Sequence, residues 1–240
     1  MGDLILSRVD DGVGVLSFNR PERHNALNDE LLRVWRDELG RLAADTTVRV
    51  IVLRGEGTSF SSGRDTAELG MRAAGESDFD FVLREQREAL KLRHLAQPIV
   101  VALKGWTLGG SFELALHCDF RVASTDTRVG FPEVTHGLVP DVGGPQALVA
   151  LAGPERAKRL ILTGEPIDAA TAAAWGIVGE VVAPDRLDAR AVELARSLAA
   201  LPPAAVAAAK QLIDAPLDDT VTRSLRRELR AQVELFRDRA

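Results

Sequence analysis

The chain has 240 residues, of which 46% are hydrophobic and 27% charged, a mix that excludes a disordered protein and suits one large α/β domain or two small ones. Its net charge of −5 provides no overall attraction to nucleic acid, so a polyanionic ligand would need a local basic patch. Cys118 is the only cysteine, no apolar run approaches the roughly 18 residues of a membrane span, and no secretory signal opens the chain. We therefore expect a cytoplasmic protein with neither nucleic acid nor membrane as a partner.

The first half of the chain alternates between predicted strands and helices. Ile5–Val9 and Val13–Phe18 are β-prone runs joined by Asp-Asp-Gly, which predicts a hairpin. Asn28 is a predicted N-cap for a helix whose apolar residues recur at helical spacing. Val48–Leu53 and Ile99–Leu103 are continuous apolar runs, typical of strands that are covered on both faces.

The later part of the chain is mostly helical. A helix over Phe79–Leu95 precedes the second buried strand, and short strands are expected at Phe120–Ala123, Val129–Phe131 and Val178–Val182. From Gly143 onward, alanine-rich helical segments dominate. The order predicts a core of βα repeats followed by a helical section that caps it or mediates assembly.

Each buried strand runs into a turn of small residues. The first is followed by Gly55–Asp65, and the second by Gly105–Gly110, which turns the chain into a helix. Free N–H groups and the positive end of that helix suit a developing oxyanion. Glycines that merely permit a tight turn would explain the same pattern.

Other catalytic motifs are missing from the sequence. Gly105–Ser111 lacks the ending of a P-loop, and no G-x-S-x-G elbow is present, so Ser62 and Ser111 are weak candidates for a nucleophile. The four histidines show no metal-ligand spacing.

Three carboxylates carry more information. Glu113 lies in the first turn of an otherwise apolar helix, Glu133 follows Pro132, and Asp141 lies in a glycine-rich loop. A charge in an apolar helix is costly to bury without a purpose or a partner. Helix capping would also explain Glu113, and solvation of loops would explain the other two acids.

Taken together, these segments resemble the crotonase family, the enoyl-CoA hydratase/isomerase superfamily. The resemblance runs from about residue 4 to the final helix and keeps the order and spacing of the family. Its matching stretches are Asn19–Leu27 (NRPERHNAL), Phe60–Asp65 (FSSGRD), Pro98–Asp119, Gly130–Glu133 (GFPE), Gly137–Gly144, Leu162–Gly164 (LTG) and Ala172–Val178 (AAAWGIV).

The resemblance implies a fold and a substrate class. The fold would be an α/β spiral of ββα repeats, with a core and CoA site over residues 1–195 and a helical trimerisation or capping region over residues 196–240. The assembly would be a homotrimer or a dimer of trimers. The substrate would be an acyl-CoA thioester, and no separate cofactor is expected because coenzyme A is part of the substrate.

The resemblance also implies roles for particular residues. The oxyanion hole would be formed by the backbone N–H groups of Arg64 and Gly110, and the two hydratase glutamates would be Glu113 and Glu133. The Arg64 side chain is free to meet a CoA phosphate, since only its main chain is needed. The CoA-binding residues would be Ala26, Ser62, Arg64, Asp65 and Thr66.

Asp141 leaves more than one reaction compatible with the resemblance. Many hydratases of the family have glycine at this position, whereas several isomerases have aspartate. Hydration of a 2,3-enoyl-CoA is the first hypothesis, and isomerisation of an enoyl-CoA or dienoyl-CoA double bond that uses Asp141 is the second. A non-catalytic relative that binds acyl-CoA is the third. Asp141 would also suit a solvated position just before a helix.

Overall fold

The larger sheet positions the rest of the fold. The computed structural model describes residues 3–237, apart from the side chains of residues 215–221, 224, 227–228, 231–232 and 234–237 in the last helix. Six strands lie in the order β1-β2-β3-β4-β6-β9, with β1 antiparallel to β2 and all other neighbours parallel. Their bounds are β1 Ile5–Asp10, β2 Val13–Phe18, β3 Val50–Gly55, β4 Ile99–Leu103, β6 Phe120–Ser124 and β9 Glu180–Val182.

A smaller sheet and the helices complete the chain. The smaller sheet has the order β5-β7-β8, formed by Trp106–Leu108, Arg128–Gly130 and Ile167–Asp168. The helices are α1 Asp29–Ala44, α2 Asp78–His94, α3 Gly110–Leu116, α4 Gly144–Ala152, α5 Pro154–Thr163, α6 Ala169–Ala174, α7 Leu187–Ala199 and α8 Pro203–Arg237. Short 3₁₀ turns are η1 Pro21–Arg23, η2 Thr66–Glu68, η3 Pro132–His136 and η4 Pro184–Arg186.

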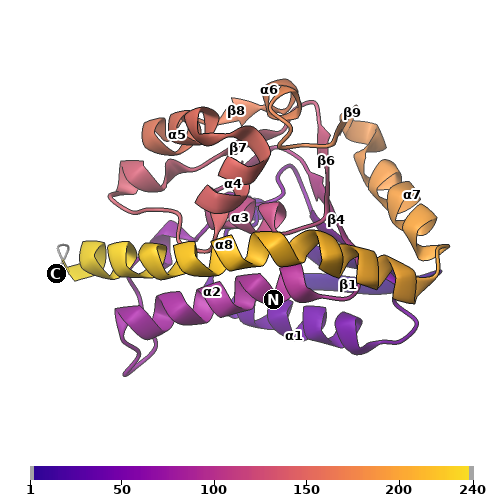
Figure 1. Ribbon diagram of the computed structural model, residues 1–240, viewed down its shortest axis with the longest axis horizontal. Helices are drawn as coiled ribbons and strands as arrows, with labels where there is room; N and C mark the ends of the chain where they lie inside the picture. Colours follow the sequence, from indigo (N-terminus) through magenta and orange to yellow (C-terminus); the bar gives the residue numbers. More distant parts are fainter. Residues whose placement is uncertain (1–2, 238–240) are drawn as a thin grey trace.

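Both faces of the larger sheet are buried. Val50 and Val52 pack with the alanine face of α7, whereas the alternate residues Ile51 and Leu53 belong to the main core with α1 and α3. The period of two along β3 therefore divides the core into two layers, which confirms the prediction of strands covered on both faces. Figure 1 shows α7 apart from α1, on the other side of the sheet.

Most predicted elements are present, with differences at their ends. The hairpin and the Asn28 cap are confirmed, and the Asn28 side chain accepts a hydrogen bond from Leu31 N–H at 2.9 Å. The strand predicted over Val48–Leu53 begins instead at Val50, since Val48 still belongs to the turn after α1. The stretch expected to be only a turn contains β5, because it pairs with β7, far along the chain.

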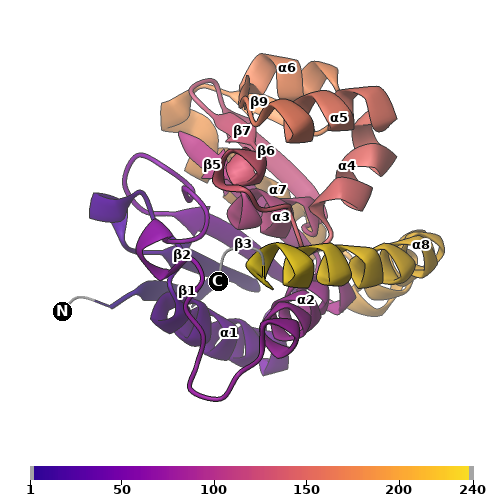
Figure 2. The ribbon, with the colours of Figure 1, turned by 90° about the vertical axis from the view of Figure 1, so that its left-hand side faces the viewer.

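The last helix runs along the molecule beside α2, as Figures 1 and 2 both show. It also contacts α4. The expected boundary between the core region (1–195) and the helical C-terminal region (196–240) falls inside α7. Residues 1–2 of the first region and 238–240 of the second lie outside the described part. Within the described part, no single helix is long and apolar enough to cross a membrane. One pair of helical segments, Pro184–Ala199 and Pro203–Asp214, would be long and apolar enough together, but the two are bent by 107° relative to each other.

Candidate active site

Two neighbouring strands bring the two glycine-rich junctions together. Strands β3 and β4 are parallel and adjacent, so the loops after them leave the sheet at the same edge. The first loop then pairs with β5: Ser61 N–H donates to Trp106 O at 3.0 Å, and Leu108 N–H donates to Ser61 O at 3.1 Å. This pairing holds Arg64 and Gly110 in the lining of one cavity.

The N–H groups of Arg64 and Gly110 are both available at that cavity. Leu27 N–H donates to Gly63 O at 2.8 Å, and Asp65 N–H donates to Leu27 O at 2.9 Å. In such a parallel pairing the middle residue, Arg64, turns its own N–H away from Leu27. Within the described part of the chain neither N–H has a hydrogen-bond acceptor, and a side chain at Gly110 would meet no atom within 4 Å. Both residues that were predicted to supply the N–H donors therefore line the same cavity, with no acceptor for either N–H among the described residues.

Gly109 sets the direction of the second N–H. Its φ of 55° and ψ of −136° suit only glycine, and a Cβ atom there would lie 2.8 Å from Glu133 Oε1. Its own N–H donates to Gly130 O at 2.9 Å. The same residue therefore directs the start of α3 into the cavity and leaves room for the Glu133 carboxyl group.

The Glu113 carboxylate is held by the start of another helix. Glu113 is 1% exposed, and its oxygens accept hydrogen bonds from the N–H groups of Val142 at 3.1 Å and Gly144 at 2.8 Å, with a longer one from Asp141 at 3.4 Å. These donors lie at the N-terminus of α4, where negative charge is stabilised. The burial of this charge is thus explained by backbone donors from a loop that sequence spacing alone does not connect to it.

Glu133 has a different environment. It is the second residue of the turn η3, directly after Pro132, and its Oε2 atom is buried without a hydrogen-bond partner in the described part. Burial, and to a smaller extent the Asp141 charge, raise the pKa of Glu133 to about 8. Burial and the Glu85 charge raise the pKa of Asp141 to about 7, against the opposing effect of Arg72. Glu133 is therefore suited to carry a proton near neutral pH.

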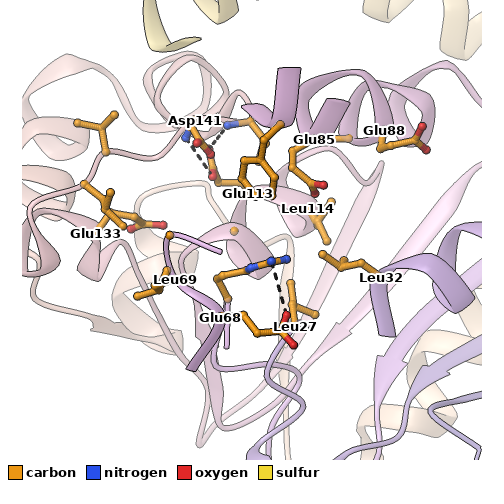
Figure 3. Close-up of a pocket in the computed structure, with 18 of the residues that line it drawn as sticks. Leu27, Leu32, Glu68, Leu69, Glu85, Glu88, Glu113, Leu114, Glu133 and Asp141 are labelled. Atoms are coloured by element: carbon orange, nitrogen blue, oxygen red, sulfur yellow. Dashed lines mark hydrogen bonds and ion pairs between the residues drawn. The ribbon is translucent and has the colours of Figure 1, made fainter. Parts of the chain in front are cut away.

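The cavity has a volume of about 140 Å³, and it contains all three predicted acids with both predicted N–H donors. Figure 3 shows Glu113 and Asp141 close together, with Glu133 across the cavity from Glu85 and Glu88. The prediction had not included the residues from α1 and α2 that complete the wall, which are Leu32, Trp35, Arg36, Phe81, Glu85, Glu88 and Ala89. The apolar members follow the helical periodicity of α1 and α2, and nothing in the sequence marks the three charged ones as part of a site.

The predicted CoA-binding residues lie mostly outside the lining of this cavity. Ala26 is buried, and its carbonyl accepts from Arg20 Nη1, whose guanidinium also pairs with Asp65 at 3.1 Å. Thr66 is exposed, and Ser62 N–H donates to the carbonyl of His24 at 2.9 Å. Each of these predicted residues lies within two positions of Leu27 or Arg64, which do line the cavity.

The Arg64 guanidinium has protein partners. It pairs with Asp29 at 2.5 Å and lies 3.7 Å from the Glu68 carboxylate. The prediction that this side chain meets a CoA phosphate therefore requires it to leave the ion pairs seen here. Of the five residues predicted to bind CoA, Arg64 alone lines the cavity.

Comparison with known proteins matches this architecture. The family model of enoyl-CoA hydratase/isomerase matches residues 8–240. The chain is 37% identical to the 2,3-dehydroadipyl-CoA hydratase of Escherichia coli, over 89% of this chain and 82% of the relative. It is 35% identical to the short-chain-enoyl-CoA hydratase of Clostridium acetobutylicum, over 93% of this chain and 86% of the relative. The crystal structure of an enoyl-CoA hydratase/isomerase from Xanthobacter autotrophicus Py2 is 31% identical with a TM-score of 0.89, covering 98% of this chain and 88% of that one, which confirms the predicted fold class.

Proposed function

Because this chain belongs to the enoyl-CoA hydratase/isomerase family, we propose that it adds water across the 2,3-double bond of an enoyl-CoA thioester. The proposal rests on one observation: a single cavity is lined by Arg64 and Gly110, whose N–H groups have no acceptor among the described residues, and by Glu133, whose Oε2 has no partner there either. Attack at C3 moves electrons toward the thioester, so negative charge develops on its oxygen. The N–H groups of Arg64 and Gly110 would hold that oxygen, and one such donor contributes about 3–4 kcal/mol in a comparable hydrolase.

The two glutamates would divide the proton transfers. Three backbone donors favour the ionised form of Glu113, which would accept a proton from water as the water oxygen bonds to C3. Glu133, with its raised pKa, would donate its proton to C2 of the enolate. The product gains H and OH, and return of one proton from Glu113 to Glu133 resets the pair. No cofactor takes part, since coenzyme A enters with the substrate.

Loss of crotonyl-CoA absorbance tests this proposal. Glu133→Gln should lower turnover by about 100-fold to 10,000-fold, because a positioned proton donor contributes that much. Glu165→Gln changes an exposed glutamate outside the cavity lining, so it is the matched control and should keep wild-type activity. Full activity in Glu133→Gln would refute the assignment. Binding of CoA thioesters with no turnover in the wild type would favour a non-catalytic acyl-CoA-binding relative.

Double-bond isomerisation remains the second candidate, because Asp141 lines the same cavity and its charge raises the pKa of Glu133. A proton taken from one carbon of the acyl chain and returned to another needs a second acid of this kind. Asp141→Asn should then abolish isomerisation of 3-enoyl-CoA or dienoyl-CoA while hydration survives. Equal isomerase activity in wild type and variant would leave Asp141 with a structural role only.

We also propose that the protein works as a homotrimer or a dimer of trimers in the cytoplasm, with α8 as the capping and assembly element. Leu212 and Ile213 on α8 are 78% and 69% exposed, and Val149 and Leu151 on α4 are exposed as well. A second copy would cover this apolar face. Ile213→Asp should shift the mass measured by light scattering toward the monomer, and an unchanged mass would contradict this interface.

A further inference from the structure

One end of the cavity is polar, although a pocket for a plain hydrocarbon chain gains from apolar walls. Helix α1 contributes Arg36 beside Trp35, and helix α2 contributes Glu85 and Glu88. Figure 3 shows these two glutamates across the cavity from Glu133, with Leu114 between Glu85 and Leu32. An acyl group whose thioester oxygen lies between the two N–H donors would extend toward this end.

At that end of the cavity, the Nε–H group of Arg36 is a hydrogen-bond donor without an acceptor among the described residues. Its Nη2 atom donates to Glu85 Oε2 at 2.6 Å, but its Nε atom lies 3.9 Å from Glu88 Oε2. Nε is buried, and no acceptor for it exists in the part of the chain that the structure describes. A buried donor without an acceptor is costly, so its position in a cavity wall points to an acceptor on the ligand.

Arg64 provides a second donor of the same kind from another element. Its Nη2 atom pairs with Asp29, whereas its Nη1 atom is buried and has no acceptor among the described residues. The guanidinium lies 5.6 Å from the centre of the Phe81 ring, which lines the cavity from α2. Two arginines that are far apart in the sequence thus line the same cavity, and each has a buried N–H without an acceptor among the described residues.

The charges around the cavity and its volume further restrict the charge and the length of the acyl group that it can hold. Glu85 also pairs with Arg84 at 2.5 Å, and Glu88 pairs with Lys91 at 2.6 Å, so each carboxylate beside Arg36 has a basic partner. The charges around the polar end are therefore largely balanced. The cavity, at about 140 Å³, is close to the roughly 150 Å³ that holds a benzene ring in an engineered cavity, which suits a short acyl group.

Building on the proposed hydratase function, we propose that the substrate is a short enoyl-CoA whose acyl chain carries a hydrogen-bond acceptor at its distal end. Arg36 Nε binds that acceptor, and Arg64 Nη1 supplies a second donor. A terminal carboxylate and a terminal hydroxyl group share this chemistry. A plain alkyl end leaves both buried donors unsatisfied, and sites built to bind a polar group discriminate strongly against analogues that lack it.

The first experiment compares enoyl-CoAs of equal length. Hydration is followed with trans-2-hexenoyl-CoA, its terminal carboxylate analogue and its terminal hydroxyl analogue. We expect kcat/KM for at least one polar analogue to exceed that for hexenoyl-CoA by about 10-fold or more. The two polar substrates identify the acceptor. Preference for hexenoyl-CoA over both would overturn the inference and leave the proposed hydratase function intact, whereas no hydration of any enoyl-CoA would refute that function itself.

The second experiment changes the donor. Arg36→Met removes Nε and keeps the length of the side chain, so the ratio of kcat/KM for the polar substrate to that for hexenoyl-CoA should fall by about 10-fold. Arg33→Met is the matched control on the same helix, since Arg33 is 65% exposed and pairs with Asp37, and it should leave the ratio unchanged. Arg36→Lys keeps the charge near Glu85 if the methionine variant folds poorly, and the ratio should still fall. An unchanged ratio in both Arg36 variants would overturn the inference.

Discussion

Replacement of Gly109 by alanine tests the geometry of the candidate oxyanion site. The backbone at Gly109 has a positive φ of 55°, and the added Cβ would lie 2.8 Å from Glu133 Oε1. Either the backbone rotates and moves the N–H of Gly110, or the Glu133 carboxyl group is displaced. Both changes disturb groups that the proposed hydration needs.

The expected magnitudes follow from these two effects. Backbone strain of this kind costs about 1–3 kcal/mol. A loss in the middle of that range lowers the Tm of a chain this size by about 4–8 °C. Loss of one oxyanion donor should lower kcat by about 100-fold to 1,000-fold.

Calorimetry and the crotonyl-CoA absorbance assay measure the two effects. The matched control is Gly40→Ala, because a Cβ on Gly40 in helix α1 would meet no atom within 4 Å. That variant should be stabilised by about 0.5–1 kcal/mol and keep full activity. If Gly109→Ala kept wild-type kcat while Gly40→Ala behaved as expected, the assignment of Gly110 N–H to the oxyanion site would be wrong.

Three further predictions concern the acids and the loop that holds them. Hydratase kcat/KM should fall as pH rises through about 8, because Glu133 then loses its proton. Its raised pKa also makes wild type less stable as pH rises from about 4.5 to about 8, so the difference between the Tm of Glu133→Gln and the Tm of wild type should increase over that range. Parallel curves of Tm against pH would contradict this prediction. Gly144→Ala places a Cβ 2.7 Å from the Glu113 side chain, so it should lower the free energy of unfolding by about 1–3 kcal/mol and reduce turnover. A wild-type Tm and a wild-type kcat in this variant would show that Glu113 has room to move. Gln86 Nε2 donates to the carbonyl of Asp141 at 2.7 Å and to the carbonyl of Leu225 in α8 at 3.0 Å, so it fixes the loop that carries Asp141. Gln86→Leu should therefore lower kcat by a larger factor than it raises KM. A larger effect on KM than on kcat would exclude a positioning role.

Local sequence determined much of the fold, because its signals act between near neighbours. The apolar run ending in Leu53 could be assigned to a strand covered on both faces, and Asn28 to a cap, without any knowledge of their partners. Glu113 was singled out because a charge in an apolar helix needs a partner. The resemblance of the motifs to one family then brought Arg64 and Gly110 together in one hypothesis, and both line the same cavity.

Tertiary structure decided what depends on groups far apart in the chain. Strand β5 exists because it pairs with β7, and its own three residues carry too little signal to predict it. The donors that hold Glu113 come from residues 141–144, a loop whose path is set by packing on α3 and α8. Arg36 and Glu85 meet at the polar end of the cavity only because α1 and α2 lie together. A sequence pattern can show that a charged residue needs a partner, but the partner is chosen by the packing of distant elements, because burial and hydrogen bonding act through space.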